Sequence, residues 1–274
     1  PYFVDEKHSV LMNPFVEFLR AAIEMVVQSF SYESVFRYLR CGLSSLSREE
    51  TDAMENYVLA LGIRGLKAYG ETWTRGYRGI KPDEVPQRNL LREKFYAEVQ
   101  PFAEQMKKKD ATVRERTEAL YALAVQNQMQ EKLEERRQQF EERGQEAFAK
   151  EYSQIYGIVM ELLDKIVEVL GDEKMTLAEY QEILEAGFAE ASVGIIPPTA
   201  DQVLIGDNER SRLKDIRVLF FVGVNDGLIP RHDAGGGILS EYDREELERA
   251  DAKLSPTARE TMYPVSYTHL RAHE

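Results

Sequence analysis

The chain has 274 residues, a formal net charge of −13 and a hydrophobic fraction of 43%. That is enough apolar sequence for one large domain or two ordinary ones, and the composition excludes a disordered chain. No apolar run approaches the roughly 20 residues of a membrane span, and a single cysteine, Cys41, excludes an internal disulfide or a cysteine metal cage. With no signal pattern at the N-terminus, we expect a cytoplasmic protein. The acidic balance disfavours an independent nucleic-acid-binding module unless basic residues gather on one face.

The first 60 residues predict one short strand and three helices. Tyr2–Val4 has the character of the end of a strand, so the sequence is expected to be an internal segment of a longer protein. Polar capping residues then precede three apolar stretches with helical spacing. The predicted caps are Asn13, Ser31 and Ser47. Gly42 and Gly62 predict the ends of the second and third helices.

Residues 62–86 are rich in glycine and proline and contain the only tryptophan, which predicts a loop-rich junction and a domain boundary. From about Pro86 to Glu190 the sequence predicts helices almost throughout, with capping boxes at Thr112 and Thr176. Few apolar residues lie between 125 and 146, which predicts a solvated helix. Alternating steps of four and three then predict a packed seam. The predicted seam residues are Phe148, Tyr152, Ile155, Val159, Leu162, Ile166 and Val169.

The sequence changes character after Pro197-Pro198. Gln202–Ile205 and Arg217–Val222 are short apolar runs bounded by glycines, which is typical of buried, parallel strands. Because α/β sequence lies on both sides of the helical block, the block is predicted to be an insertion. We expect residues 1–10, 202–206 and 217–222 to form strands of one sheet.

No catalytic constellation is visible in the sequence. The phosphate-binding pattern G-x-x-x-x-G-K-[ST] is absent, so we expect the isolated chain neither to bind ATP tightly nor to hydrolyse it. The four histidines lack the spacing of metal ligands, and we expect no metal site.

The most informative stretch runs from Gln202 to Pro230. A charged connection between the two predicted strands carries basic residues in an acidic chain. These residues are Arg210, Arg212 and Lys214. They either contact phosphate groups or form a solvated connection, and the residues alone favour neither interpretation. Asn225 and Asp226 then form a turn at the carboxyl end of a strand, where open α/β sheets place ligand sites.

These residues carry a resemblance to a known family. QVLIGD at 202–207 and RLKDIRVLFFVGVNDGLIP at 212–230 closely resemble the motif V region of AddB-type subunits of bacterial helicase–nucleases, which are relatives of the UvrD-like superfamily 1 helicases. PYFVDEK at 1–7 and NPFVEF at 13–18 resemble the family's entry into its second motor domain. FSYESVFRYL at 30–39 and ENYVLALGIR at 55–64 are also similar to the family. The resemblance covers residues 1–263 and is least specific in the helical block.

The resemblance implies a fold class that is α/β but mostly helical. It would be a partial RecA-like (P-loop NTPase-like) second helicase domain with a large all-helical insertion. Residues 1–60 and 198–263 would belong to the RecA-like domain, and residues 61–197 would be the accessory insertion. Residues 264–274 instead resemble a translated sequencing adapter, and we expect them to have no function.

The resemblance also implies which residues form a site. Active UvrD-like helicases carry T-x-H-x-x-K-G-L-E in motif V, which contacts single-stranded DNA and the nucleotide. Here Asp207, Glu209, Arg212 and Asp215 align with its Thr, His, Lys and Glu, and Leu213 replaces its glycine. Only Arg212 and Asp215 keep the charge type. The candidate DNA- or nucleotide-contacting residues are Glu209, Arg210, Arg212, Lys214, Asp215, Asn225 and Asp226.

By this resemblance the chain is part of a subunit that processes DNA ends in double-strand-break repair and recombination. Its partners would be DNA and an AddA-type helicase–nuclease subunit, with Chi recognition by the heterodimer and no membrane. ATP and Mg²⁺ would serve the parent complex, and an iron–sulfur cluster and a nuclease metal would lie outside this chain, which itself would hold no cofactor. Two alternatives remain: a segment of an active UvrD-like helicase, and a non-enzymatic helical interaction scaffold.

Overall fold

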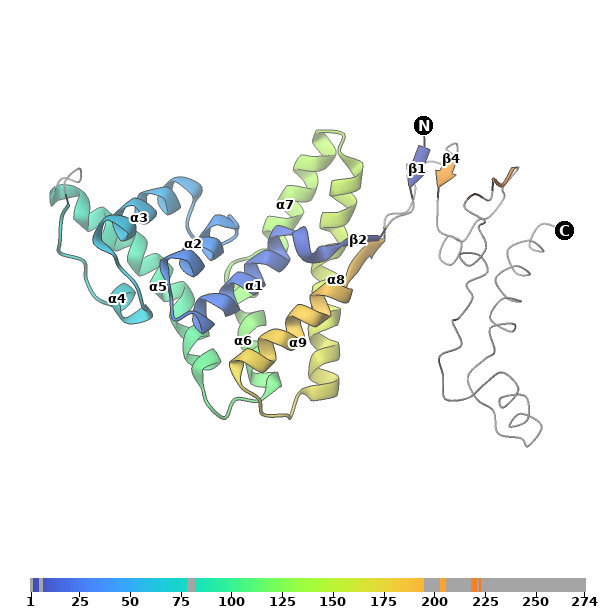
Figure 1. The fold of residues 1–274 in the computed structure, drawn as a ribbon. Helices are drawn as coiled ribbons and strands as arrows, with labels where there is room; N and C mark the ends of the chain where they lie inside the picture. Colours follow the sequence, from blue (N-terminus) through green and yellow to red (C-terminus); the bar gives the residue numbers. More distant parts are fainter. Residues whose placement is uncertain are drawn as a thin grey trace. The chain divides into compact units, whose positions relative to one another are not determined.

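The computed structural model describes residues 2–4, 7–77, 82–194, 203–205, 218–220 and 222. Helices dominate these residues, as expected for a mostly helical protein (Figure 1). The chain divides into two compact units, one of residues 1–5 and 201–274 and one of residues 6–200. The described helices all lie in the second unit, which we call the helical unit.

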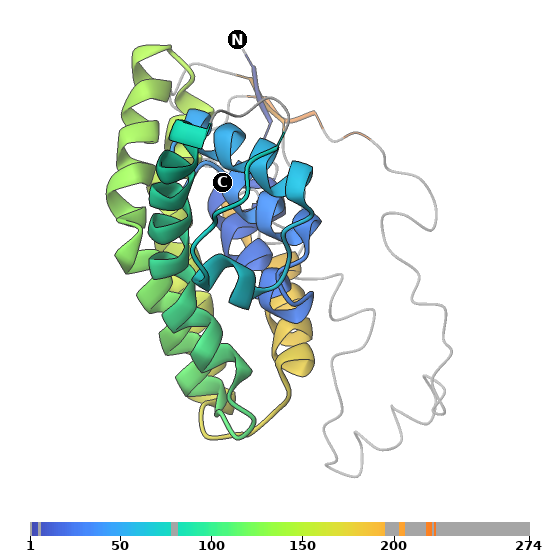
Figure 2. The same cartoon turned by 90° about the vertical axis from the view of Figure 1, so that its left-hand side faces the viewer.

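The first half of the helical unit contains η1 (Val10–Met12), α1 (Pro14–Val27), α2 (Tyr32–Arg40), α3 (Arg48–Leu61) and α4 (Leu66–Gly70). The second half contains η2 (Pro82–Glu84), α5 (Val85–Lys107), α6 (Val113–Gln126), α7 (Met129–Glu142), α8 (Glu146–Leu170) and α9 (Leu177–Glu190), of which α5 and α8 are the longest, with 23 and 25 residues. α7 and α8 pair along their lengths as a hairpin. α1 and α9 are far apart in the sequence but lie side by side (Figures 1 and 2), joined by the ion pair of Arg20 with Glu185 at 2.7 Å.

Local chemistry sets the starts of these helices as the sequence predicts. The Asn13 side chain accepts the backbone N–H of Phe15, and the Ser31 side chain accepts that of Ser34. Complete capping boxes open α3, α6 and α9, at Ser47–Glu50, Thr112–Glu115 and Thr176–Glu179. In each box the glutamate carboxylate accepts the backbone N–H of the N-cap residue, and the N-cap side chain accepts the backbone N–H of the glutamate. Two backbone donors that have no partner within the helix are thereby satisfied. The predicted helices that these caps begin are confirmed.

The core of the helical unit runs through both of its halves. Buried residues of α1–α3 and of α5–α9 form one apolar cluster. Phe15 of α1 stacks on Tyr156 of α8, with ring centroids 5.9 Å apart, so the apolar stripe of α1 is covered by the helical block. The boundary expected between residues 60 and 61 is therefore not a boundary between compact units. The chain divides instead between residues 200 and 201, close to the expected 197, and between residues 5 and 6.

The described part of the glycine-rich stretch, residues 62–77 and 82–86, lies within the helical unit. Trp73 is only 7% exposed and stacks on Tyr57 of α3, with ring centroids 4.9 Å apart. Its indole Nε1 donates to the Ala68 carbonyl at 2.9 Å. The segment around Trp73 therefore packs against the core, since its aromatic ring is buried and the indole N–H is satisfied.

The packed seam of α8 differs from the predicted one at three positions. Leu163, 3% exposed, is buried in place of Leu162, while Phe148 is 51% and Val169 77% exposed. The predicted seam has a period of 3.5 residues, whereas a straight α-helix has 3.6 residues per turn. Over 25 residues the buried face drifts away from a strict alternation. The middle of the seam, Ile155 and Val159, is buried as predicted.

Strands are few and form two separate pairs among the described residues. β1 (Tyr2–Val4) pairs in parallel with β4 (Val203–Ile205), which confirms that these predicted strands share a sheet. β2 (Lys7–Ser9) pairs antiparallel with β3 (Ser192–Gly194) in a different sheet, so the prediction of a single sheet containing all of residues 1–10 is wrong. The cause is local, since the chains entering and leaving the helical unit lie together there, and Val10 N–H donates to the Ala191 carbonyl at 3.4 Å.

The predicted strand Arg217–Val222 is also corrected. At its described positions, 218–220 and 222, the backbone has no strand structure. Phe220 is 83% exposed. A parallel strand needs a hydrogen-bonded neighbour and cover on both faces, and the described residues supply neither.

Candidate nucleic-acid interface

The first candidate site is the one predicted from the sequence, which follows β4 along the chain. Val4 pairs with Ile205 at the carboxyl ends of both strands, so both chains leave the pair at the same edge. In the sequence, the charged connection follows Ile205 directly. The carboxyl edge of a parallel sheet is where α/β proteins bind ligands.

The structure does not place the predicted site residues themselves. All seven lie outside the described residues: Glu209, Arg210, Arg212, Lys214, Asp215, Asn225 and Asp226. Their role in contacting DNA or nucleotide therefore stays a prediction.

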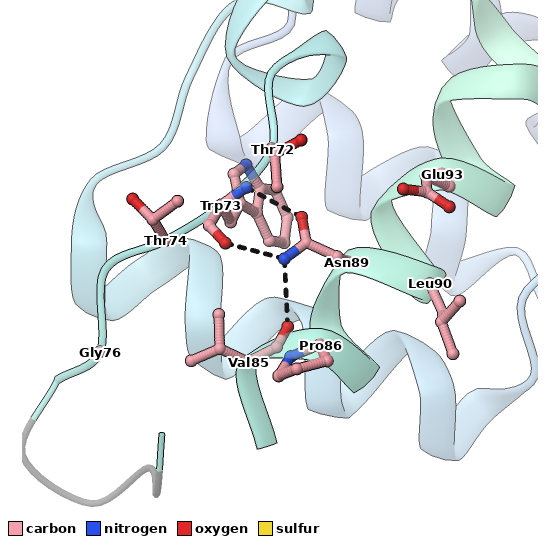
Figure 3. Close-up of a pocket in the computed structure, with 9 residues that line it drawn as sticks. All are labelled: Thr72, Trp73, Thr74, Gly76, Val85, Pro86, Asn89, Leu90 and Glu93. Carbon is pink, nitrogen blue, oxygen red and sulfur yellow. Dashed lines mark hydrogen bonds between the residues drawn. The ribbon is translucent and has the colours of Figure 1, made fainter. Parts of the chain in front are cut away.

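A second candidate lies in the helical unit, where a shallow hollow of about 650 Å³ runs beside the start of α5. Residues of the segment between α4 and η2 form one wall, and the first turns of α5 form the other (Figure 3). The lining residues are Thr72, Trp73, Thr74, Gly76, Val85, Pro86, Asn89, Leu90 and Glu93. Apart from Glu93 they are uncharged, and they combine hydroxyl and amide groups with apolar side chains.

Asn89 forms the floor of this hollow and fixes its shape. Its Oδ1 accepts the Trp73 backbone N–H at 2.8 Å, and its Nδ2 donates to the Trp73 carbonyl at 2.8 Å (Figure 3). The same Nδ2 donates to the Val85 carbonyl at 3.2 Å. The Asn89 side chain thus satisfies both the backbone N–H and the backbone carbonyl of Trp73, as a neighbouring β-strand would. The backbone groups of Thr72, Thr74 and Gly76 form no hydrogen bond to the described residues.

The charged residue beneath the hollow is used internally. Arg92 is 4% exposed, and its guanidinium donates to the Tyr69 carbonyl at 2.9 Å, to Asn89 at 3.0 Å and to Glu93 at 2.8 Å. Burial raises the pKa of the Tyr69 phenol, whose hydroxyl has no hydrogen-bond partner among the described residues. Arg92 therefore supports the loop and is not available to a ligand.

A buried polar cluster joins α2, α5 and α7. Glu98, 2% exposed, accepts the Tyr38 hydroxyl and the Ser45 backbone N–H, the latter at 2.8 Å. Lys132 donates to the carbonyls of Leu43 and Ser44 at 2.7 and 2.9 Å. Burial lowers the pKa of Lys132, and the charge of Glu98 opposes that shift. The cluster ties the loop between α2 and α3 to two other helices, which is a structural role.

Neither a metal nor a reactive thiol is indicated by the described residues. No three His, Cys, Asp or Glu side chains among them are placed to hold a metal ion. Burial raises the pKa of Cys41 to about 12, so this thiol stays protonated at neutral pH and is a poor nucleophile. No helix in the described part of the chain has both the length and the apolarity to cross a bilayer.

The hollow beside Asn89 was missed by sequence reasoning. Its one local signal was an asparagine within the first turns of a helix, a residue that favours bonds to nearby backbone over helical structure. Nothing in the sequence pairs this residue with Trp73, 16 positions earlier.

No family model matches the chain. Comparison with individual known proteins nevertheless places it in a family. It is 45% identical to the B subunit of the ATP-dependent helicase/deoxyribonuclease of Lachnoclostridium phytofermentans over 96% of its length. It is 41% identical to the protein of the same name from Anoxybacillus flavithermus over 96% of the chain, and 38% identical to that from Alkaliphilus metalliredigens over 94%.

These relatives all bear the name of one class of protein, the ATP-dependent helicase/deoxyribonucleases. The chain spans 23% of the length of the Lachnoclostridium relative and 24% of the Anoxybacillus one, about a quarter in each case. It belongs to the AddB family, the B subunits of this class, and corresponds to a segment of such a subunit. The resemblance seen in the sequence is confirmed at this level.

Proposed function

We propose that the chain is part of the helicase-like region of an AddB protein that works with an AddA-type helicase–nuclease partner on DNA ends. The heterodimer would act in double-strand-break repair and recombination and would recognise Chi. The observation that carries this proposal is the 45% identity to the B subunit of a helicase/deoxyribonuclease across 96% of the chain.

The unit of residues 1–5 and 201–274 is proposed to be part of the RecA-like second motor domain. The parallel register of β1 with β4, which are about 200 residues apart, supports this, because parallel strands need a long crossover connection. The helical unit is that connection. We therefore propose that residues 6–200, rather than 61–197, form the accessory insertion.

Residues Glu209 to Asp226 are proposed to contact DNA or nucleotide at the carboxyl edge of this sheet. Asp207, Glu209 and Leu213 depart from the pattern of active UvrD-like motors, which supports an auxiliary role for this protein in its complex. ATP and Mg²⁺ would serve the parent complex. An iron–sulfur cluster does not fit this chain's residues, because the chain has one cysteine and such clusters take several thiolates.

The proposal is tested in full-length AddB together with its partner. Arg210, Arg212 and Lys214 are changed to Ala, and the affinity for single-stranded DNA is measured over a series of salt concentrations. If all three contact phosphates, the slope of log affinity against log salt falls by about 2, since each single-strand contact contributes about 0.7.

A matched control changes Lys109, Arg143 and Lys165, three exposed basic residues of the helical unit, to Ala. This variant removes the same charge and should leave the slope unchanged. An unaltered slope in the Arg210, Arg212 and Lys214 variant would identify the connection as a solvated turn.

A further inference from the structure

The stretch between Gly62 and Arg92 has a charge opposite to that of the chain. It contains seven Lys and Arg residues and three Asp and Glu residues, a balance of +4, whereas the whole chain carries −13. Positive charge concentrated in an acidic protein is the pattern expected where a polyanion binds.

Three of these basic residues lie on the connection between α3 and η2, in the loop of residues 64–76 that includes the short helix α4. Arg64 and Lys67 flank the start of α4, and Arg75 follows Trp73. The bond from Trp73 Nε1 to the Ala68 carbonyl holds the segment after α4 against that helix, and the Tyr57 hydroxyl donates to the Arg75 carbonyl. The Gly65 N–H donates to the Phe30 carbonyl at 3.0 Å, which holds the backbone next to Arg64 as well.

The three side chains are free to bind a ligand. All are exposed, and Lys67 is the most open, with 91% of its side chain accessible. Its ion pair with Glu71 is 3.7 Å long, an exposed contact of little energetic value. Arg64 and Arg75 have no carboxylate partner among the described residues. Arg92, by contrast, is buried and committed to the Tyr69 carbonyl.

The hollow beside Asn89 adjoins this loop and supplies neutral donors. Thr72 and Thr74 line its wall, and their hydroxyl groups are neutral donors (Figure 3). Cations spaced along a loop next to hydroxyl donors match the repeated charge of a sugar–phosphate backbone.

We propose that the loop of residues 64–76 binds the phosphate backbone of a DNA strand through Arg64, Lys67 and Arg75, with Thr72 and Thr74 as neutral donors. This surface is separate from the predicted motif V-like residues. It rests on the proposed function only for the identity of the polyanion.

The test uses full-length AddB with its partner and single-stranded oligonucleotides. Arg64, Lys67 and Arg75 are changed together to Gln, which removes three charges from exposed positions and should leave the melting temperature unaltered. We expect the salt slope of binding to fall by about 2, with a several-fold loss of affinity at moderate salt. The control changes Lys109, Arg143 and Lys165 to Gln and should reproduce the wild-type slope.

The outcomes separate this inference from the proposed function. A wild-type slope for the loop variant, with a reduced slope for the Arg210, Arg212 and Lys214 variant, would overturn the loop inference and leave the proposed function standing. Weaker binding of the AddA-type partner with unchanged DNA affinity would also overturn it, because the loop would then be a protein contact. Wild-type DNA binding in both variants would count against both proposals.

Discussion

Asn89 and Trp73 are joined by a reciprocal pair of hydrogen bonds, each 2.8 Å long, between the asparagine amide and both backbone groups of the tryptophan. The pair connects α5 to a segment that has no regular secondary structure, and it forms the floor of the hollow.

Changing Asn89 to Ala should destabilise the fold by about 2 kcal/mol, because it leaves a buried N–H and a carbonyl of Trp73 unpaired. Trp73 is the only tryptophan, so its fluorescence should shift towards the red as water reaches the loop. Urea unfolding followed by fluorescence and by circular dichroism measures both effects. Gln87→Ala, an exposed change on the same helix, is the control. Equal stability of the two variants would show that the asparagine bonds contribute nothing net.

Two glycines should respond in opposite directions to alanine. Gly62 ends α3 with φ at +64°, a conformation that costs an L-residue about 1–2 kcal/mol, so Gly62→Ala should be destabilising. Gly157 lies within α8 with open space where a Cβ would go. Gly157→Ala should therefore stabilise the protein by about 0.5–1 kcal/mol through the lower entropy of the unfolded chain. Denaturant midpoints of the two variants measure the difference, and a shift of the same sign in both would contradict it.

The sequence predicts features that depend on residues close together in the chain better than features that depend on distant ones. Ser47, Thr112 and Thr176 were identified as caps because a capping box involves residues only three apart. The compact unit of residues 6–200 continues across residue 60, because α1 packs on α8, a contact between residues 15 and 156. No local pattern contains that information.

The same limit applies to the sites. The hollow depends on a contact between Asn89 and Trp73, and its polar lining has no motif. The resemblance to AddB pointed to residues 209–226, which the comparisons support as part of the family segment but which the structure does not describe. Leu162 and Leu163 show a further physical cause: neighbouring apolar residues differ by 100° around a helix, and only the partner helix decides which is buried.

Acid should weaken the capping box of α9. Backbone and side-chain hydrogen bonds from Thr176 lower the pKa of Glu179 below its ordinary value of 4.5. Because the pKa of Glu179 is lower in the folded state than in the unfolded state, its charge stabilises the fold fully at any pH above the unfolded-state pKa. This stabilisation is lost as the pH falls through the lower, folded-state pKa. Glu179→Gln keeps an acceptor for the Thr176 N–H but cannot titrate. The difference in melting temperature between wild type and this variant should therefore shrink as the pH drops from 6 to about 3. A constant difference would show that the carboxylate charge is irrelevant to the cap.

The last prediction concerns the polar cluster formed by the buried Glu98 and the half-buried Lys132. Glu98→Gln weakens the acceptor of the Tyr38 hydroxyl and the Ser45 N–H, and Lys132→Met leaves the carbonyls of Leu43 and Ser44 without a donor. Each single change should destabilise the protein by about 2 kcal/mol, since both leave buried polar groups poorly paired.

The double variant should be more stable than the sum of the two single effects predicts, by about 1 kcal/mol. The reason is that the charge of Glu98 favours the charged form of Lys132, so Lys132 contributes less once that charge is lost. A double-mutant cycle from urea unfolding gives this coupling energy directly. As a control, Glu98→Gln combined with Lys165→Met, which changes an exposed lysine on α8, should be additive. If the free-energy changes of Glu98→Gln and Lys132→Met instead prove additive as well, two independent sets of hydrogen bonds, and not coupled charges, hold the loop between α2 and α3.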